Sequence, residues 1–422
     1  MIRLYYSGRR KNNRYLLSVS INGFKKIFLS AVIGCSVVLL SSCVPYNSVK
    51  FQKEIGVKLA DTLATKETVI LFHNLREISN QGKIIFGHQN STEYGVFWRN
   101  DSIRSDVKDV CGSFPGVYGW DFESIPKVDS EKVKHRVPLL VKQAYERGGI
   151  NTFSWHIPNP VTDSTFYDTT IAVRHILPGG MYFHKYLRML DTMVEYSKQF
   201  VDENKKPIPI IFRPYHEFDG HWFWWGKPFC TREEFIQLWQ ITVDYLRTYK
   251  KVNNFLYAYS PDRNFFSEEE YLERYPGDDY VDIFGMDNYF DFELGGDSSQ
   301  FVQKKLMIIT QIAEKKNKIA AFTETGQQLV PDTTWFTKKL YPMMASDSVR
   351  IAYVMVWRNA HQRHFYVPYP GHPAAKDFVE FRYLPRMLFE DDLPDMYHTV
   401  VMSDLLAKLF DERKKIRVNN VQ

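Results

Sequence analysis

Cysteine is scarce in this chain, with only four among 422 residues. Cys35 and Cys43 lie near the N-terminus, whereas Cys111 and Cys230 are far apart in the remainder. Such isolated cysteines match neither the paired spacing of a zinc site nor the dense framework of a small disulfide-stapled domain. We therefore expect Cys111 and Cys230 to be two unpaired thiols in a fold that depends on its hydrophobic core.

Acidic residues are absent from the first 42 positions, which carry seven Lys and Arg residues. In the remainder, 47 basic residues face 49 acidic ones, so the net charge there is −2 although the whole chain carries +5. A nucleic acid partner requires a strongly basic surface, and this balance gives no support for one.

The apolar run near the N-terminus, Ile27–Leu40, has only fourteen residues, which is short for a membrane-spanning helix and suits a signal peptide. The run leads into Ser41-Ser42-Cys43, which resembles the signal of a Bacteroidetes-type bacterial lipoprotein, where the cysteine is acylated. We expect a lipoprotein signal peptide at 1–42, lipidation of Cys43, a tether at 43–53 and one globular domain at 54–422. An uncut membrane anchor is the alternative. Because no acidic run follows Cys43, a lipid-anchored protein of the outer membrane that faces the periplasm is favoured over surface display.

No linker, repeat or low-complexity tract interrupts the region after the tether. Short apolar runs alternate there with segments of helical spacing, which indicates a parallel sheet covered on both faces. Eight such units predict an α/β fold, a (β/α)8 TIM barrel with long βα loops. A doubly wound open sheet is the alternative, but no glycine-rich phosphate loop follows the first run. The apolar runs are Ile84–His88, Val117–Asp121, Ile150–His156, Ile208–Glu217, Phe255–Ser260, Val281–Asp287, Ile319–Glu324 and Ile351–Trp357; the helical segments include Lys132–Arg147, Phe183–Phe200, Arg232–Lys250, Phe301–Lys316 and Trp335–Ala345.

Two glutamates end predicted strands, where barrel enzymes place their chemistry. Glu217 ends the fourth run and is followed by four consecutive aromatic residues, Trp222–Trp225. Exposed indole rings are typical of sites that stack on the apolar face of a sugar. Glu324 ends the seventh run. A pair of carboxyl groups on opposite sides of one bond is what glycoside hydrolysis requires, so the sequence predicts this chemistry.

The pattern resembles glycoside hydrolase family 26, whose members are mostly β-mannanases, from about Gly82 to Ala360. The resemblance is carried by Gly87-His88-Gln89, Gly119-Trp120-Asp121, Ser154-Trp155-His156, Arg213-Pro214-Tyr215-His216-Glu217, Trp222-Phe223-Trp224-Trp225-Gly226, Asp287-Asn288-Tyr289, Glu324-Thr325-Gly326 and Trp357-Arg358.

This resemblance implies a retaining mechanism in which Glu217 is the acid/base and Glu324 the nucleophile. Arg213 and Tyr289 are similar to residues that support the nucleophile by hydrogen bonds. The substrate is expected to be β-mannan or manno-oligosaccharide, cut by a monomer that needs no cofactor and no metal. Residues expected to bind substrate are Glu123, His156, His216, Trp222, Trp225, Asp287, Trp357 and Arg358, with Glu123, His156, Trp357 and Arg358 on the non-reducing side of the cut and Trp222 on the leaving-group side.

Other functions remain open at this point. A relative that cuts β-glucan or β-xylan, and a non-catalytic glycan-binding lipoprotein, are both compatible with the motifs. A metallohydrolase would use His88, Asp121, His156, His216 and Asp287, but the pair of histidines that usually opens such a site on the first strand is missing.

The mode of attack is a further open choice. An endo-acting β-1,4-mannanase needs a cleft open at both ends, and this is the favoured prediction. Two long segments, Pro158–Met181 and Asn359–Asp395, could instead form a wall beyond the second sugar and make the enzyme release mannobiose.

Overall fold

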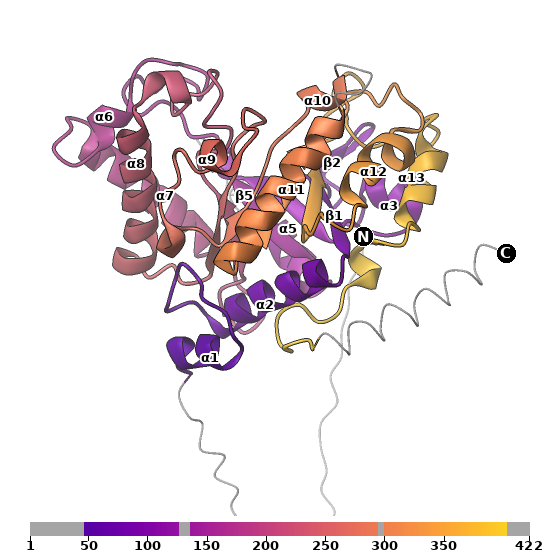
Figure 1. Cartoon of the computed structure of the whole chain (residues 1–422), viewed down its shortest axis with the longest axis horizontal. Coiled ribbons are helices and arrows are strands. Elements are labelled where there is room, and N and C mark those ends of the chain that lie inside the picture. Colours follow the sequence, from indigo (N-terminus) through magenta and orange to yellow (C-terminus); the bar gives the residue numbers. More distant parts are fainter. Residues whose placement is uncertain (1–45, 126–135, 294–298, 403–422) are drawn as a thin grey trace, which may run out of the picture. The chain divides into compact units, whose positions relative to one another are not determined.

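The computed structural model describes residues 46–125, 136–293 and 299–402. The region from Tyr46 onward forms one compact unit. Its centre is a ring of parallel strands, and the helices between them lie on the outside of the ring (Figure 1). The prediction of a single (β/α)8 barrel is therefore confirmed.

Eight strand positions form the barrel, in the order in which they follow along the chain. The last two positions close the ring, because β10 pairs with β11 and residues Asp287 and Glu324 bridge β8 to β10. The barrel strands are β1 (Ile84–Gln89), β4 (Val117–Asp121), β5 (Ile150–Ser154), β6 (Ile210–Arg213), β7 (Phe255–Tyr259), β8 (Ile283–Phe284), the interrupted strand β9 (Ile319–Ala320) and β10 (Phe322–Thr325), and β11 (Tyr353–Val356).

Three short strands lie outside this ring. β2 (Tyr94–Gly95) and β3 (Trp98–Arg99) form an antiparallel hairpin after β1. β12 (Met387–Leu388) pairs with the N-terminal end of β1. The helices are α1 (Ser48–Glu54), α2 (Lys66–Asn80), α3 (Asp106–Cys111), α5 (Arg136–Glu146), α6 (Val173–Ile176), α7 (Phe183–Ser197), α8 (Arg232–Asp244), α9 (Glu268–Tyr271), α10 (Phe290–Glu293), α11 (Ser299–Lys316), α12 (Tyr341–Met344) and α13 (Ala375–Arg382), with π-helical turns at Tyr245–Tyr249 and Phe336–Leu340 and 3-10 turns at Phe122–Ser124, Lys227–Phe229, Asp278–Tyr280 and Glu390–Asp392.

Alternate strand residues belong to different buried clusters, as the pleat of a strand requires. Ile211 packs with Leu256 and Ile283 of neighbouring strands and with residues of α2. Its neighbours Ile210 and Phe212 belong to a second cluster with side chains of the surrounding helices. Because both faces of each strand are buried, the strands read as continuous apolar runs in the sequence.

Helix boundaries follow local signals. Thr231 caps α8 and forms a capping box with Glu234, which satisfies backbone donors that the first turn leaves free. The segment predicted as one helix over Arg232–Lys250 is α8 followed by a π-helical turn, and the predicted Trp335–Ala345 helix is a π-helical turn followed by α12.

Two boundaries differ from the sequence prediction. β6 ends at Arg213, four residues before Glu217, because the backbone leaves the extended region there. At the other end, Ser48–Glu54 form α1 within the stretch expected to be a tether, and the Ser48 hydroxyl donates to the Ala64 carbonyl at 2.8 Å. The predicted signal peptide at 1–42 and the predicted lipidation site Cys43 lie outside the described residues.

Cys111 and Cys230 are both buried and unpaired, as predicted. Among the described residues, no helix combines the length and the apolar character needed to cross a membrane.

Candidate active site

Glu217 is presented by a strained turn after β6. Tyr215 and Glu217 have φ of 49° and 54°, values that side-chain-bearing residues seldom adopt. The Glu217 amide donates to the Ser260 carbonyl at 2.9 Å, and the Gly220 amide donates back to the Glu217 carbonyl at 3.0 Å. Backbone strain of this kind persists where surrounding contacts hold it and is common at functional sites. Here it turns the Glu217 carboxyl away from the strand direction.

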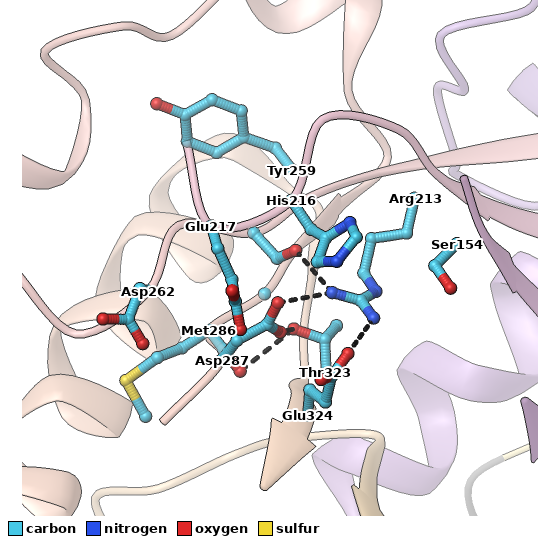
Figure 2. Close-up of polar contacts among 12 residues, drawn as sticks. Ser154, Arg213, His216, Glu217, Tyr259, Asp262, Met286, Asp287, Thr323 and Glu324 are labelled. Atoms are coloured by element: carbon cyan, nitrogen blue, oxygen red, sulfur yellow. Dashed lines mark hydrogen bonds and ion pairs between the residues drawn. The ribbon is translucent and has the colours of Figure 1, made fainter. Parts of the chain in front are cut away.

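Glu324, at the tip of β10, is only 5% exposed and receives two strong donors. The Tyr289 hydroxyl donates to Oε1 at 2.7 Å, and Arg213 Nη2 donates to Oε2. Arg213 is the last residue of β6, four residues before Glu217, and its side chain reaches Glu324 at the tip of β10 (Figure 2). A guanidinium and a phenol hydroxyl both favour the ionised form of the carboxylate that they contact.

Asp287 holds the other side of the Arg213 guanidinium. Arg213 Nη1 donates to Asp287 Oδ2, and Thr323 Oγ1 donates to Asp287 Oδ1 at 2.7 Å (Figure 2). Asp287 was predicted to bind substrate; in the structure its side chain is completely buried in this ion pair. Burial opposes the charge on Arg213, but the carboxylates of Asp287 and Glu324 outweigh it and raise the pKa of Arg213, so the guanidinium stays charged.

Glu217 has the opposite surroundings. Burial, followed by the negative charges of Glu324, Asp287 and Asp262, raises the pKa of Glu217 well above its usual value. Its hydrogen-bond partner is the indole of Trp222, whose Nε1 donates to Glu217 Oε2 at 2.6 Å. These surroundings favour the protonated form of Glu217 near neutral pH, as a general acid requires.

His216 precedes the acid and is 1% exposed. Burial, together with the charges of Arg213 and His156, lowers the pKa of His216 well below its usual value and keeps the ring neutral. The His156 ring lies edge-on to it, with a centroid distance of 4.6 Å.

A second charged group lies on the β4, β5 and β11 side of the site. His156 Nδ1 and Asp121 Oδ2 are 2.5 Å apart, and Ser154 Oγ donates to the same oxygen at 2.6 Å. Burial alone would raise the pKa of Asp121, but His156 and the hydrogen bonds lower it to about 2. Burial disfavours charge on His156, yet Asp121 raises the pKa of the ring. The two side chains therefore stabilise each other's charged forms.

The other residues predicted for the non-reducing side lie near this pair. The Trp357 ring is 6.3 Å from that of His156, and Arg358 Nη1 donates to the Tyr94 hydroxyl at 3.3 Å. Glu123 is exposed beside them, and its amide donates to Asp121 Oδ1 at 2.6 Å.

The indoles of the Trp222–Trp225 stretch differ in their exposure. Trp222 is partly exposed beside Glu217, whereas Trp224 and Trp225 are fully buried. Trp225 Nε1 donates to the His216 carbonyl at 2.8 Å. Trp225 was predicted to bind substrate; in the structure its ring is buried and holds the backbone beside Glu217.

Tyr167 is a site residue that the sequence analysis missed. It is 61% exposed, on the long segment after β5, and stacks on Phe223 with a centroid distance of 5.6 Å. Burial, and next the charges of Glu217 and Glu324, raise the pKa of Tyr167. The sequence marked that segment as long but gave no reason to choose this tyrosine.

The residues weighed for a metal site do not converge. Asp287 is held by Arg213, Asp121 by His156, and His88 Nδ1 lies 3.0 Å from Ser91 Oγ. Among the residues described, no three His, Cys, Asp or Glu side chains form a group suited to a metal ion.

Comparison with known proteins places this geometry in a family. The model of glycosyl hydrolase family 26 matches residues 60–362. A mannan endo-1,4-beta-mannosidase of Bifidobacterium adolescentis is 33% identical over 351 residues, which cover 77% of this chain and 35% of that protein. One of Bacillus subtilis is 26% identical over 323 residues, 72% of this chain and 82% of that protein.

Solved structures agree. A GH26 beta-mannanase of Bacteroides ovatus has 40% identity and a TM-score of 0.74, over 79% of this chain and 98% of that one. GH26C of a Muricauda species has 41% identity and a TM-score of 0.76, over 81% and 96%. With the family model matching most of the chain, this protein belongs to glycosyl hydrolase family 26.

Proposed function

We propose that the protein is a retaining glycosidase that cleaves β-1,4-mannosidic bonds within mannan, galactomannan or glucomannan. The observation that carries this is the contrast between two glutamates at the tips of β6 and β10, one surrounded by negative charge and one held by cationic and phenolic donors. The names of the relatives from Bifidobacterium adolescentis and Bacillus subtilis support mannan as the polymer.

In the first step, the ionised Glu324 attacks the anomeric carbon while Glu217 donates its proton to the glycosidic oxygen, and the bond to the leaving chain breaks. Arg213 and Tyr289 hold the attacking carboxylate in one orientation, which saves the entropy of positioning it. The products are a glycosyl ester on Glu324 and a shorter chain with a new hydroxyl.

In the second step, Glu217, now ionised, takes a proton from a water molecule whose oxygen attacks the glycosyl ester. The ester bond breaks and Glu324 returns to its two donors, so two inversions give net retention. Such a double displacement requires carboxyl groups about 5–5.5 Å apart. The configuration of the first product, followed by proton NMR, tests this: an initial α-anomer would exclude it.

Substrate identity is tested by product analysis on mannan, glucomannan, mixed-linkage glucan and xylan. We expect oligosaccharides from mannan and glucomannan. Cleavage of xylan or mixed-linkage glucan alone would contradict the proposal, and absence of any product, with unchanged glycan binding, would favour a non-catalytic glycan-binding protein.

Release of mannobiose is a second candidate, favoured by a wall on the β11 side. Beyond Arg358, the β2–β3 hairpin and the segment after β11 are packed together. Arg99 donates to the Ala360 carbonyl at 3.1 Å, and Phe97 meets Tyr369 edge-on with a centroid distance of 5.1 Å. Early time points on soluble galactomannan separate the two modes. A rapid fall in viscosity with mixed products supports endo-cleavage, and mannobiose alone supports the second candidate.

We further propose that Cys43 is lipidated and anchors the enzyme in the outer membrane, facing the periplasm. The support is the sequence Leu40-Ser41-Ser42-Cys43 after a short apolar run, without acidic residues behind it. Cys43→Ala should move the protein from the membrane fraction to the soluble fraction. Unchanged membrane retention would contradict the lipid anchor, and digestion of the protein by protease added to intact cells would contradict the periplasmic orientation.

A further inference from the structure

Three phenylalanines are exposed close to one another on the side of β7 and β8. Phe266, after β7, is 66% exposed, Phe290, at the start of α10, is 41% exposed, and Phe301, at the start of α11, is 37% exposed. The rings of Phe266 and Phe301 meet edge-on, with centroids 6.0 Å apart. We call these three residues the phenylalanine platform. Apolar rings that are grouped on a protein surface mark a binding site more often than they occur there by chance.

Two cations contact rings of the platform and hold them in place. Arg263 Cζ lies 3.8 Å from the centroid of Phe290, and Lys305 Nζ lies 4.8 Å from that of Phe266. Both cations reach the same buried carboxylate, Asp291, with Lys305 at 2.7 Å and Arg263 at 3.9 Å. Lys305 is itself 1% exposed. A buried charged group held by a buried partner makes a rigid support, so the rings are oriented before any ligand arrives.

The platform is continuous with the catalytic site. Phe290 follows Tyr289, whose hydroxyl contacts Glu324, and Arg263 follows Asp262, whose charge acts on Glu217. Figure 1 shows α10 and the beginning of α11 at the upper rim, opposite α1 and α2. This is the rim at which the catalytic strands end.

The strand order indicates which side of the cut the platform faces. β6 and β10, which carry the glutamates, divide the ring into one arc of β11, β1, β4 and β5 and another of β7 and β8. Arg358, Trp357, His156 and Asp121 belong to the first arc, which the resemblance assigns to the non-reducing side. The second arc therefore faces the leaving-group side.

We propose that the phenylalanine platform is a binding surface for distal sugar units of the polysaccharide on the leaving-group side of the cut. Flat apolar rings match the C–H face of a pyranose, and the neighbouring Arg263 and Asp262 offer partners to its hydroxyl groups. The proposal rests on the proposed function and adds that long chains are held beyond the reacting bond, as an endo-acting enzyme requires.

The test is the double substitution Phe266→Ala and Phe290→Ala. We expect kcat/KM on galactomannan to fall about tenfold, since each ring contributes only a modest stacking energy. Hydrolysis of an aryl β-mannobioside, which has no sugar on the leaving-group side, should be unchanged. The matched control is Tyr383→Ala, which removes an aromatic ring that is 40% exposed and lies beside Arg382, outside the platform.

Affinity electrophoresis in gels that contain galactomannan, glucomannan or xylan supplies a readout independent of turnover. The double variant should be retarded less than wild type and the Tyr383→Ala variant equally. Equal retardation and unchanged kcat/KM on polymer would overturn the platform, as would an equal loss on the aryl substrate. If the wild type cuts and binds only a different glycan, the proposed function fails while the platform is still tested on that glycan.

Discussion

The two glutamates proposed to be catalytic have opposite electrostatic surroundings. Glu324 receives hydrogen bonds from the Arg213 guanidinium and the Tyr289 hydroxyl. Glu217 receives one from the Trp222 indole and is otherwise close to the negative charges of Glu324, Asp287 and Asp262. The same side-chain type therefore receives two strong donors at one site and is surrounded by negative charge at the other.

This difference shows how the fold gives two glutamates different roles. The network around Glu324 is built on Arg213, which lies on the strand that leads to Glu217. One strand thus supplies both the acid and the cation that stabilises the opposite carboxylate. Substitutions that change the surroundings of one glutamate and leave those of the other intact test this difference.

Removing the nucleophile should have the largest effect. Glu324→Ala should lower kcat on every substrate by about 10⁴-fold or more, because no glycosyl ester can form. Steady-state rates on galactomannan and on an activated aryl mannobioside measure this. Retained activity on the aryl substrate would show that another group attacks the sugar.

Removing the acid should produce a smaller effect that depends on the leaving group. Glu217→Ala should cost about 10²–10⁴-fold on mannan, whose leaving alcohol needs a proton, and little on a dinitrophenyl mannobioside, whose leaving group does not. Added azide, which needs no general base, should attack the glycosyl ester in place of water and yield the β-mannobiosyl azide. Equal losses of activity on both leaving groups would contradict the assignment of Glu217 as the acid.

Much of the barrel and the catalytic pair can be predicted from sequence, since buried parallel strands are continuous apolar runs that end in functional residues. Trp225 and Asp287 show the limit. Both belong to the motifs that carry the family resemblance, yet Trp225 supports the His216 backbone and Asp287 neutralises Arg213. Whether a residue faces the cleft or the core depends on a turn of one or two residues, which composition does not determine.

Other features depend on contacts between distant segments. Tyr167 lies on a long segment after β5, and its position depends on stacking against Phe223. The platform depends on Asp291, which holds one cation from the loop after β7 and another from α11. No local pattern encodes such meetings, so they could not be predicted.

A milder change should test the nucleophile's surroundings alone. Tyr289→Phe removes the hydroxyl that donates to Glu324 and leaves Arg213 in place. Burial and the Glu324 charge raise the pKa of Tyr289, so the hydroxyl is a donor at all working pH values. We expect kcat to fall roughly 10- to 100-fold with a smaller change in KM, as for loss of one hydrogen bond to a charged group. A changed KM with unchanged kcat would make Tyr289 a substrate-binding residue.

The smallest expected effect concerns the carboxylate that tunes the acid. Burial and the neighbouring Asp219 raise the pKa of Asp262 to about 7, so Asp262 is ionised mainly above that pH and then opposes ionisation of Glu217. Asp262→Asn removes this charge and should move the alkaline limb of the kcat/KM profile to lower pH, by less than about one unit. The acid limb should stay in place, and the exposed Asp279→Asn should change neither limb.

Stability gives the same substitution a second readout. The folded state keeps a proton on Asp262 between its ordinary pKa of 3.8 and about 7, whereas the unfolded chain loses it. The native state therefore binds more protons in this window, and the contribution of Asp262 to stability falls as pH rises through it. Asp262→Asn removes that slope, so the Tm of the variant should gain on wild type from pH 4 to pH 7 and run parallel above it. A constant difference in Tm over this range would show that Asp262 ionises normally and does not tune Glu217.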